Sequence, residues 1–317
     1  MSIRSMKIYD TDSTRNALPF DKLIAALRQM FIVGCEVPLR HTHTLSGADG
    51  TQGTVLIMPA WRTDSYLGIK TVNIFPGNSA RGLPGLFSTY VLYDASTGAP
   101  LAQIDGNEIT SRRTAAASAL AASRLARPDS HRLLVVGSGR VGSLLPEAYR
   151  QVLPIEEVWV WDRKAANAQA LVDRLRSQGI VATVAPDLAA AAAQADIVSC
   201  ATLATEPLIH GEWLSAGSHL DLIGSFTPQM READDTCFSG SRIFVDTEEA
   251  LQKSGELLGP MARAVFSVAD VVGTLADLCR GVVPGRASAT ERTVFKSVGT
   301  ALEDLAAAAL VAGPHSR

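Results

Sequence analysis

Cysteine is scarce in this sequence, and the cysteines present do not form a recognisable framework. They are Cys35, Cys200, Cys237 and Cys279, which lie far apart along 317 residues. No CxxC pair occurs, so a zinc site of the usual spacing is excluded, and a small disulfide-linked fold is not indicated. A reducing compartment suits these thiols, and we expect Cys200 and Cys279 to be buried packing residues.

Long apolar runs are also missing. The most apolar stretches, residues 188–195 and 305–312, are rich in alanine and far shorter than the roughly 20 residues that cross a bilayer. The first ten residues include Arg4 and Lys7, but no apolar segment follows them, so a secretory signal is not indicated. These absences predict a cytoplasmic protein with no membrane partner.

No block of like charge interrupts the chain. The 29 basic and 32 acidic residues are interspersed and give a net charge of −3, which points to no nucleic-acid partner. The hydrolase motifs GxSxG and HExxH do not occur. His41 and His43 share one face of a presumed strand, but no third ligand is evident, so we expect no metal site. The length and the 47% hydrophobic content suit a globular protein of about two domains.

The second half of the chain alternates short β-branched runs with stretches rich in alanine and leucine. This pattern is typical of parallel βαβ units. The runs predict strands at residues 133–136, 158–161, 181–184, 197–200, 220–223 and 243–245. Together they predict a Rossmann-type, doubly wound parallel sheet of the α/β class.

The first half has a different pattern. Apolar residues at helical spacing predict a helix from about Pro19 to Phe31, and strand-like segments at residues 54–58, 67–72 and 89–93 predict an antiparallel sheet. A helix over residues 110–125 is expected to join the two halves. A further helical pattern over residues 288–310 closes the chain, and we expect it to pack back onto the first domain. The parallel domain, residues 116–287, is then an insertion, with the chemistry in the cleft between domains.

A glycine-rich turn follows the first strand of the parallel domain. It runs Gly137-Ser138-Gly139-Arg140-Val141-Gly142 and precedes a predicted helix, and Asp162 ends the next strand. This context is typical of a dinucleotide site, because the glycines allow a sharp turn, a close approach to the pyrophosphate and tight helix packing. A glycine turn without a nucleotide is the alternative.

Asp162 suits the ribose hydroxyls of NAD and would repel the 2′-phosphate of NADP. The adjacent Arg163 could neutralise that repulsion, so NADP stays open as cofactor. The alternative role for Asp162 is that of a helix N-cap. The rest of the cofactor is expected at the carboxyl edge of the sheet, near Thr202, Gly224 and Ser225. In the first domain, Lys70 lies within an apolar strand, Arg113 lies within the predicted helix 110–125, and Arg40 precedes a probable strand. Three such cations suit a small carboxylate substrate, and solvated edges are the alternative.

At these residues the sequence resembles the ornithine cyclodeaminase and mu-crystallin family. The resemblance lies in the segments Gly68-Ile69-Lys70, Phe75-Pro76-Gly77-Asn78, Asp105-Gly106, Arg113-Thr114-Ala115-Ala116, Gly224-Ser225-Phe226-Thr227-Pro228, Arg231-Glu232, Phe295-Lys296-Ser297-Val298-Gly299 and Asp304-Leu305. It implies that Arg40, Lys70 and Arg113 bind the substrate carboxylate and serve proton transfer, with Lys70 and Arg113 as the catalytic pair. It also implies NAD or NADP as cofactor, with Ser297 as a further cofactor-binding residue, and a homodimer built through residues 1–115 plus 288–317.

One departure from the family bears on the reaction. Cyclodeaminases of this family carry a catalytic aspartate two residues before the proline of the fifth-strand loop, and that position is Phe226 here. Reduction of a preformed cyclic ketimine needs fewer proton transfers, so we expect reduction of pyrroline-2-carboxylate to proline. Ornithine cyclodeamination, oxidative deamination of a small amino acid, and a carrier that binds nucleotide and a small acid without turnover remain as alternatives.

Overall fold

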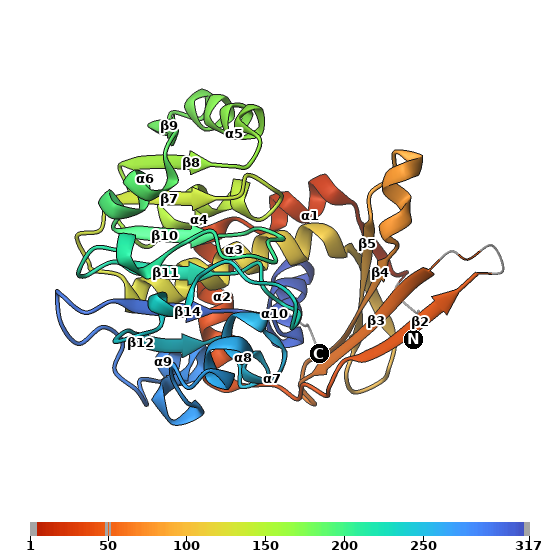
Figure 1. The fold of residues 1–317 in the computed structure, drawn as a ribbon. Coiled ribbons are helices and arrows are strands. Elements are labelled where there is room, and N and C mark those ends of the chain that lie inside the picture. The colour runs from red at the N-terminus through yellow and green to blue at the C-terminus, as the bar shows by residue number, and fades with distance from the viewer. Residues whose placement is uncertain (1–4, 48–49, 51, 314–317) are drawn as a thin grey trace. The chain divides into compact units, whose positions relative to one another are not determined.

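The computed structural model describes residues 5–47, 50 and 52–313. The chain divides into two compact units, the first formed by Met1–Arg113 with Thr300–Arg317 and the second by Thr114–Gly299. Figure 1 shows the helices and strands of both units. The chain passes from the first unit to the second within one helix, α3 (Gly106–Leu125), which covers the predicted joining helix and begins four residues earlier.

The first unit contains a mixed sheet. Its strands are β1 (Lys7–Tyr9), β2 (His41–Ser46), β3 (Gln52–Trp61), β4 (Tyr66–Ile74), β5 (Leu86–Asp94) and β6 (Pro100–Asp105), in the order β1-β6-β5-β4-β3-β2. Every pairing is antiparallel except that of β1 with β6. The antiparallel strands predicted from the sequence are therefore present, each a few residues longer than its apolar run.

Helices cover one face of this sheet. In α2 (Phe20–Val33) the residues predicted for one face are buried, namely Phe20, Leu23, Ile24, Leu27 and Phe31. The last helix, α10 (Ala301–Ala312), packs against α2 and β4. A short helix, α1 (Thr11–Ala17), and a 3-10 helix, η1 (Pro76–Arg81), complete the unit (Figure 1). The alternating burial along β4 places Gly68, Lys70 and Val72 on the helix-covered face.

The second unit is built on a parallel sheet. Its strands are β7 (Arg132–Val136), β8 (Glu157–Trp161), β9 (Ala182–Val184), β10 (Ile197–Cys200), β11 (His219–Leu222), β12 (Arg242–Val245), β13 (Val271–Thr274) and β14 (Thr293–Lys296). Their order is β13-β12-β14-β11-β10-β7-β8-β9, and every pairing is parallel. The order reverses between β7 and β10, which is the topological switch point of a doubly wound sheet. The predicted fold class is confirmed.

Helices connect these strands in the second unit (Figure 1). The α-helices are α4 (Leu145–Tyr149), α5 (Ala165–Ser177), α6 (Leu188–Gln194), α7 (Ala250–Lys253), α8 (Gly255–Ala262) and α9 (Leu275–Arg280). The 3-10 helices are η2 (Gly142–Leu144), η3 (Gly211–Trp213), η4 (Asp235–Cys237) and η5 (Val268–Asp270). Cys200 and Cys279 are buried, as predicted.

The predicted long helix over residues 288–310 is wrong. Residues Thr293–Lys296 form β14, which lies between β11 and β12 in the parallel sheet, and α10 begins only at Ala301. The side chain of Thr300 caps α10 by accepting a hydrogen bond from the amide of Leu302. The alanine-rich run after residue 300 hid the boundary, because the preceding four-residue strand is too short for a clear period. Residues 288–299 accordingly belong to the second unit.

Candidate functional site

Lys70 lies near the middle of β4 and is enclosed by the first unit. Its side chain is 2% exposed. The Nζ atom lies 2.6 Å from Oδ2 of Asp304 on α10, and it donates a 3.3 Å hydrogen bond to Oγ1 of Thr110 on α3. A buried ammonium is costly unless a counter-charge is close, and Asp304 provides one.

Arg113, on α3, shares the same carboxylate. Its Nε donates to Oδ1 of Asp304 at 3.0 Å, and its Nη1 donates to Oε2 of Glu303 at 2.6 Å. Both acids are fully buried and lie in the first turn of α10, where the helix dipole favours negative charge. Two carboxylates thus fix the plane of the Arg113 guanidinium, and Asp304 bridges it to Lys70.

The electrostatics of this cluster make Lys70 readily deprotonated. Burial lowers the pKa of Lys70 to about 8; Asp304 opposes this, whereas Arg113 and Arg40 add to it. Burial alone would raise the pKa of Asp304, but the charges of Lys70 and Arg113 outweigh it and the pKa is lowered. Asp304 therefore stays ionised while Lys70 can lose a proton near neutral pH.

Arg40 belongs to the same region of the first unit. It precedes β2 and is half-buried, and its charge acts on Lys70. The structure thus brings the three predicted cations together in the first unit, and the alternative of solvated edges is wrong for Lys70 and Arg113. His41 and His43 lie on β2 and are exposed.

Sequence reasoning missed the two acids that organise these cations. Asp304 stood out only as part of a family signature, and Glu303 did not stand out at all. The available signal was a pair of adjacent acids in a helix whose other residues are almost all apolar. Charged residues are rarely buried unless they are paired, so such a pair on an otherwise apolar helix indicates buried cationic partners.

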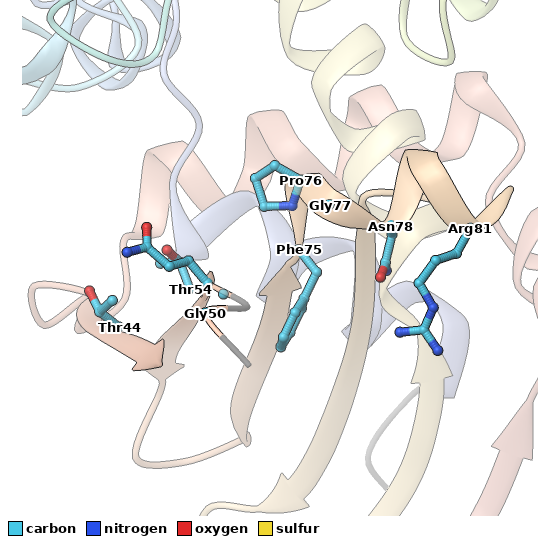
Figure 2. Close-up of a pocket in the computed structure, with 10 residues that line it drawn as sticks. Thr44, Gly50, Thr54, Phe75, Pro76, Gly77, Asn78 and Arg81 are labelled. Atoms are coloured by element: carbon cyan, nitrogen blue, oxygen red, sulfur yellow. The ribbon is translucent and has the colours of Figure 1, made fainter. Parts of the chain in front are cut away.

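A pocket of about 880 Å³ lies elsewhere in the first unit, between the β2–β3 hairpin and η1 (Figure 2). Its lining includes the side chains of Thr44, Thr54, Phe75, Asn78 and Arg81. Asn78 donates to the carbonyl of Pro84 at 3.0 Å, which holds the turn around η1. None of the described residues that line this pocket is among the predicted site residues.

In the second unit, the glycine turn has the geometry that a dinucleotide requires. Gly137 has a φ of 95°, and a Cβ there would lie 2.8 Å from the carbonyl oxygen of Ala201 and from Cγ2 of Thr202. A Cβ on Gly142 would overlap the carbonyl oxygen of Gly137, whereas a Cβ on Gly139 would meet no atom within 4 Å. The turn is therefore tight at its first and third glycines and open at its second, where a pyrophosphate would approach.

The rest of the predicted turn also lies at this edge of the sheet. Val141 has helical backbone angles just before η2 and α4, so the predicted helix is present but short. Arg140 and Arg163 are exposed. Ser138 donates to Oδ2 of Asp162 through its amide at 3.0 Å and through its hydroxyl at 2.6 Å.

Asp162 therefore links β8 to the glycine turn. Its Oδ1 accepts from the amide of Lys164 at 2.9 Å. Burial would raise the pKa of Asp162, but the hydrogen bonds from Ser138 and Lys164 outweigh this and the pKa is lowered. The N-cap alternative is wrong, because α5 begins at Ala165 with Lys164 as its N-cap residue.

The remaining predicted cofactor residues lie at the ends of β10, β11 and β14. Thr202 and Gly224 both donate to the carboxylate of Glu232. Ser225 is fully buried and its hydroxyl donates to the carbonyl of Met230. Ser297 is 5% exposed and its amide donates to the carbonyl of Leu222 at 3.1 Å. The structure places all three segments at one edge, and Glu232 is the residue there that the sequence marked only as a family signature.

Two kinds of feature are absent from the described residues, 5–47, 50 and 52–313. Among them, no group of three or more His, Cys, Asp or Glu side chains is arranged to hold a metal ion. Within the same residues, no helix combines the length and the apolar character that crossing a membrane requires.

Similarity to known proteins extends over both units of the chain. A family model described as "Ornithine cyclodeaminase/mu-crystallin family" matches residues 19–315. A Delta(1)-pyrroline-2-carboxylate reductase of Paracoccus denitrificans is 44% identical over 86% of this chain and 90% of its own.

Two solved structures are similar over most of their length. The Thermococcus litoralis Delta(1)-pyrroline-2-carboxylate reductase, solved with NADH and L-proline, superposes with a TM-score of 0.90 at 32% identity, covering 97% of this chain and 96% of that one. An archaeal alanine dehydrogenase dimer with bound NAD has a TM-score of 0.88 at 30% identity, covering 97% and 95%. This chain belongs to the ornithine cyclodeaminase/mu-crystallin family.

Proposed function

We propose that this protein is an NAD-dependent oxidoreductase that reduces a small cyclic ketimine carboxylate, with pyrroline-2-carboxylate as substrate and proline as product. The observation that carries the proposal is the buried Lys70, which has a lowered pKa and is joined to Arg113 through Asp304. The reductase of Paracoccus denitrificans, 44% identical, supports the same reaction.

In the proposed reaction, residues of the first unit bind the substrate and supply a proton. Arg113 and Arg40 bind the carboxylate, since a guanidinium matches the geometry of a carboxylate and Glu303 and Asp304 hold Arg113 in one orientation. Lys70 holds the proton that the imine nitrogen receives, because its pKa of about 8 leaves it charged at neutral pH yet ready to lose that proton. Bound nicotinamide supplies the hydride for the adjacent carbon.

Residues of the second unit suit NAD. The open space at Gly139 admits the pyrophosphate, and the tight positions at Gly137 and Gly142 hold the turn in shape. Asp162 is ionised and half-buried beside Ser138, so its carboxylate suits ribose hydroxyls and opposes the 2′-phosphate of NADP. Arg140 and Arg163 are exposed and leave NADP as a weaker second cofactor.

The loop after β11 favours ketimine reduction over ornithine cyclodeamination. Cyclodeamination must expel ammonia and serve several proton transfers, for which a carboxylate in this loop is suited. Here Phe226 is 47% exposed and apolar, and the neighbouring Ser225 is buried and hydrogen-bonded within the loop. Reduction of a preformed ketimine needs a single proton at nitrogen, and Lys70 meets that need.

The first unit also suits a homodimer. The face of the mixed sheet away from α10 is apolar and only partly covered; we call it the open face, and its central side chains are Ile57, Pro59, Leu67, Ile69 and Val91. Toward its edges, Phe87 is 45% exposed and Ile8 is 74% exposed. A second copy of the chain would bury this face, as apolar surfaces of this kind favour. The similar alanine dehydrogenase is a dimer.

The proposed site of action is the cytoplasm. The four cysteines form no disulfide among the described residues, and three of them, Cys200, Cys237 and Cys279, are buried. Free thiols persist in a reducing compartment.

The proposal is tested with purified protein, NADH and freshly prepared pyrroline-2-carboxylate. We expect loss of the NADH absorbance with formation of proline, and much slower turnover with NADPH. Release of ammonia from ornithine with catalytic NAD, without ketimine turnover, would replace the proposal by cyclodeamination. NAD-dependent oxidation of alanine alone would indicate an amino-acid dehydrogenase. Binding of NADH without turnover of any imine or amino acid would indicate a carrier.

A further inference from the structure

A buried carboxylate, Glu232, ties together two loops at the carboxyl edge of the parallel sheet. Its Oε1 accepts hydrogen bonds from the amide and the hydroxyl of Thr202 at 2.7 and 2.8 Å. Its Oε2 accepts one from the amide of Gly224 at 2.7 Å. Thr202 follows β10 and Gly224 follows β11, and Glu232 itself is 0% exposed. These charge-assisted bonds are made away from water, where such bonds are strongest.

The two loops that Glu232 holds lie directly against the glycine turn. A Cβ on Gly137 would lie 2.8 Å from Cγ2 of Thr202, and a Cβ on Gly224 would overlap the carbonyl oxygen of Thr202. Gly137 therefore lies close to the backbone of Ala201 and the side chain of Thr202, and Gly224 lies close to the backbone of Thr202.

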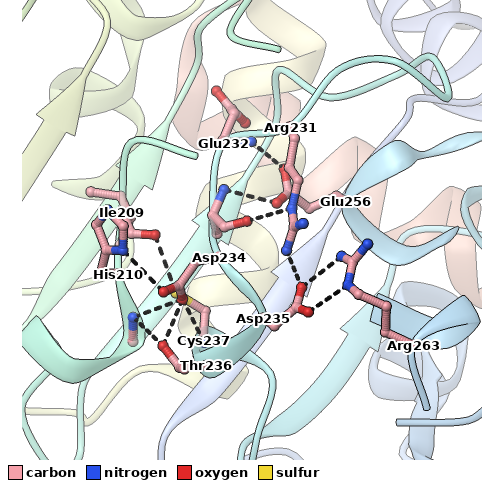
Figure 3. A network of polar contacts seen from close by, with 12 residues as sticks. Ile209, His210, Arg231, Glu232, Asp234, Asp235, Thr236, Cys237, Glu256 and Arg263 are labelled. Carbon is pink, nitrogen blue, oxygen red and sulfur yellow. Dashed lines mark hydrogen bonds and ion pairs between the residues drawn. The ribbon is translucent and has the colours of Figure 1, made fainter. Parts of the chain in front are cut away.

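Glu232 is itself held by a second layer of polar contacts (Figure 3). Glu256, on α8, accepts hydrogen bonds from the amides of Glu232 and Ala233 at 2.7 and 2.8 Å. Arg231 forms an ion pair with Asp235, which also accepts a 2.6 Å hydrogen bond from Nε of Arg263. The segment that carries Glu232 is thus anchored on both sides of it.

A buried cation balances part of the negative charge. Lys296, on β14, is fully buried and donates from Nζ to the carbonyl of Leu222 at 2.9 Å. Burial raises the pKa of Glu232 to about 8, and Lys296 is the main charge that opposes this rise. Both side-chain oxygens of Glu232 face backbone amides, which can only donate, so the geometry fits the ionised carboxylate. Glutamine in place of Glu232 keeps the shape but turns an NH₂ group toward one of the donors, so it cannot hold both loops.

We propose that Glu232 is a positioning residue for the nicotinamide half of the dinucleotide, and that it acts by fixing the backbones of Thr202 and Gly224. The inference rests on the proposed use of NAD. In an open α/β sheet the ligand lies outside the carboxyl ends of the strands at the switch point, so a dinucleotide that starts at the glycine turn continues past the loops after β10 and β11. The adenosine half depends on the glycine turn and Asp162, which Glu232 does not contact.

The test compares two ligands in the full chain by calorimetry. ADP carries the adenosine and both phosphates, whereas NADH adds the nicotinamide half. For Glu232→Gln we expect NADH affinity to fall about tenfold or more, equivalent to about 1.4 kcal/mol, with ADP affinity unchanged. Equal losses for both ligands would indicate a merely structural role and overturn the inference, as would an unchanged affinity for NADH.

Two further variants keep the test decisive. Glu256→Gln loosens the amides of Glu232 and Ala233, and we expect the same selective loss in a smaller amount; it also serves if Glu232→Gln does not fold. Asp196→Asn is the matched control, because Asp196 holds the amides of His131 and Arg132 at 2.9 and 3.0 Å at the amino edge of the sheet. We expect both affinities to be unchanged there. If the wild-type protein bound neither ligand, the proposed function would fail as well; if it bound both and no variant discriminated, only the inference would fail.

Discussion

At the scale of single residues, the chemistry depends on one carboxylate that serves two cations. Asp304 engages Lys70 through Oδ2 and Arg113 through Oδ1, at 2.6 and 3.0 Å. Asp304 favours the charged form of Lys70, and with Glu303 it fixes the orientation of Arg113. Asp304 is therefore as important to the proposed mechanism as the residues that touch the substrate.

Asp304→Asn tests this role. Removing one partner of a buried ion pair typically costs about 3–5 kcal/mol, so we expect a clear loss of stability in urea unfolding. Asp304 holds the pKa of Lys70 up, so the variant should lose activity at a lower pH than the wild type does. The exposed ion pair of Asp12 with Arg15 offers a control, and Asp12→Asn should change neither quantity. An unaltered pH profile in Asp304→Asn would contradict the assignment.

Lys70 itself gives a prediction about pH. The pKa of Lys70 is lowered to about 8, so the lysine is protonated below that pH and loses its proton above it. If it protonates the imine, kcat/KM for ketimine reduction is highest below pH 8 and falls above it. Lys70→Arg, which stays charged, should be slower and should lack this fall.

Removing the amine of Lys70 by substitution with alanine tests its role in proton transfer through kcat. A general acid typically contributes about 10²–10⁴-fold, so Lys70→Ala should lower kcat by that order. Its affinity for NADH, measured by fluorescence titration, should not change. Full activity of this variant would remove Lys70 from the mechanism.

At the scale of elements, different glycines of the turn between β7 and η2 serve the stability of the fold and the binding of a ligand. Gly142 packs against the backbone of Gly137, whereas Gly139 faces open space. One turn thus contains a glycine required by the fold and a glycine that leaves room for a ligand. The two requirements can be measured independently.

Two alanine variants make this separation. Gly142→Ala forces the start of η2 and α4 away from β7, and overpacking of this kind costs about 1–3 kcal/mol, so the melting temperature should fall. Gly139→Ala should leave the melting temperature unchanged and weaken NADH binding by roughly tenfold. Equal NADH affinity in Gly139→Ala and wild type would show that no pyrophosphate approaches this glycine.

At the scale of the whole molecule, the open face of the mixed sheet is the feature that one chain leaves incomplete. Alternate residues of β4 face α10 and are buried, while Leu67, Ile69 and Thr71 on the other side are only partly covered. A second copy that buried this face would give the sheet two covered sides, as sheets with apolar faces require.

Ile69→Lys tests the dimer. A lysine at the centre of the open face would place a charge in the proposed interface, so light scattering after gel filtration should give the 33.5 kDa of one chain rather than twice that mass. Val181→Lys, at an apolar position in the second unit that is 64% exposed, should leave the dimer intact. A monomeric wild type would refute the proposed dimer at once.

Features with a clear local pattern were predictable from the sequence, and features without one were not. The glycine turn and the strand just before Asp162 were predictable, because their patterns involve residues within a few positions of one another. The strand Thr293–Lys296 was not, since four residues carry no period and the alanine-rich run beyond it favours helix. The division between units after residue 299 followed from that strand and was missed with it.

The sequence by itself determined most of the strands and helices, where a dinucleotide would meet the chain, and which family the protein belongs to. Only the tertiary structure decided which charges are buried together. Lys70 acquires its lowered pKa from burial beneath α10, and Glu232, which lies in the same connection as Gly224, reaches Thr202 in the loop after β10. Local patterns depend on neighbours in the chain, whereas desolvation and ion pairing depend on contacts between distant segments, which no local pattern records.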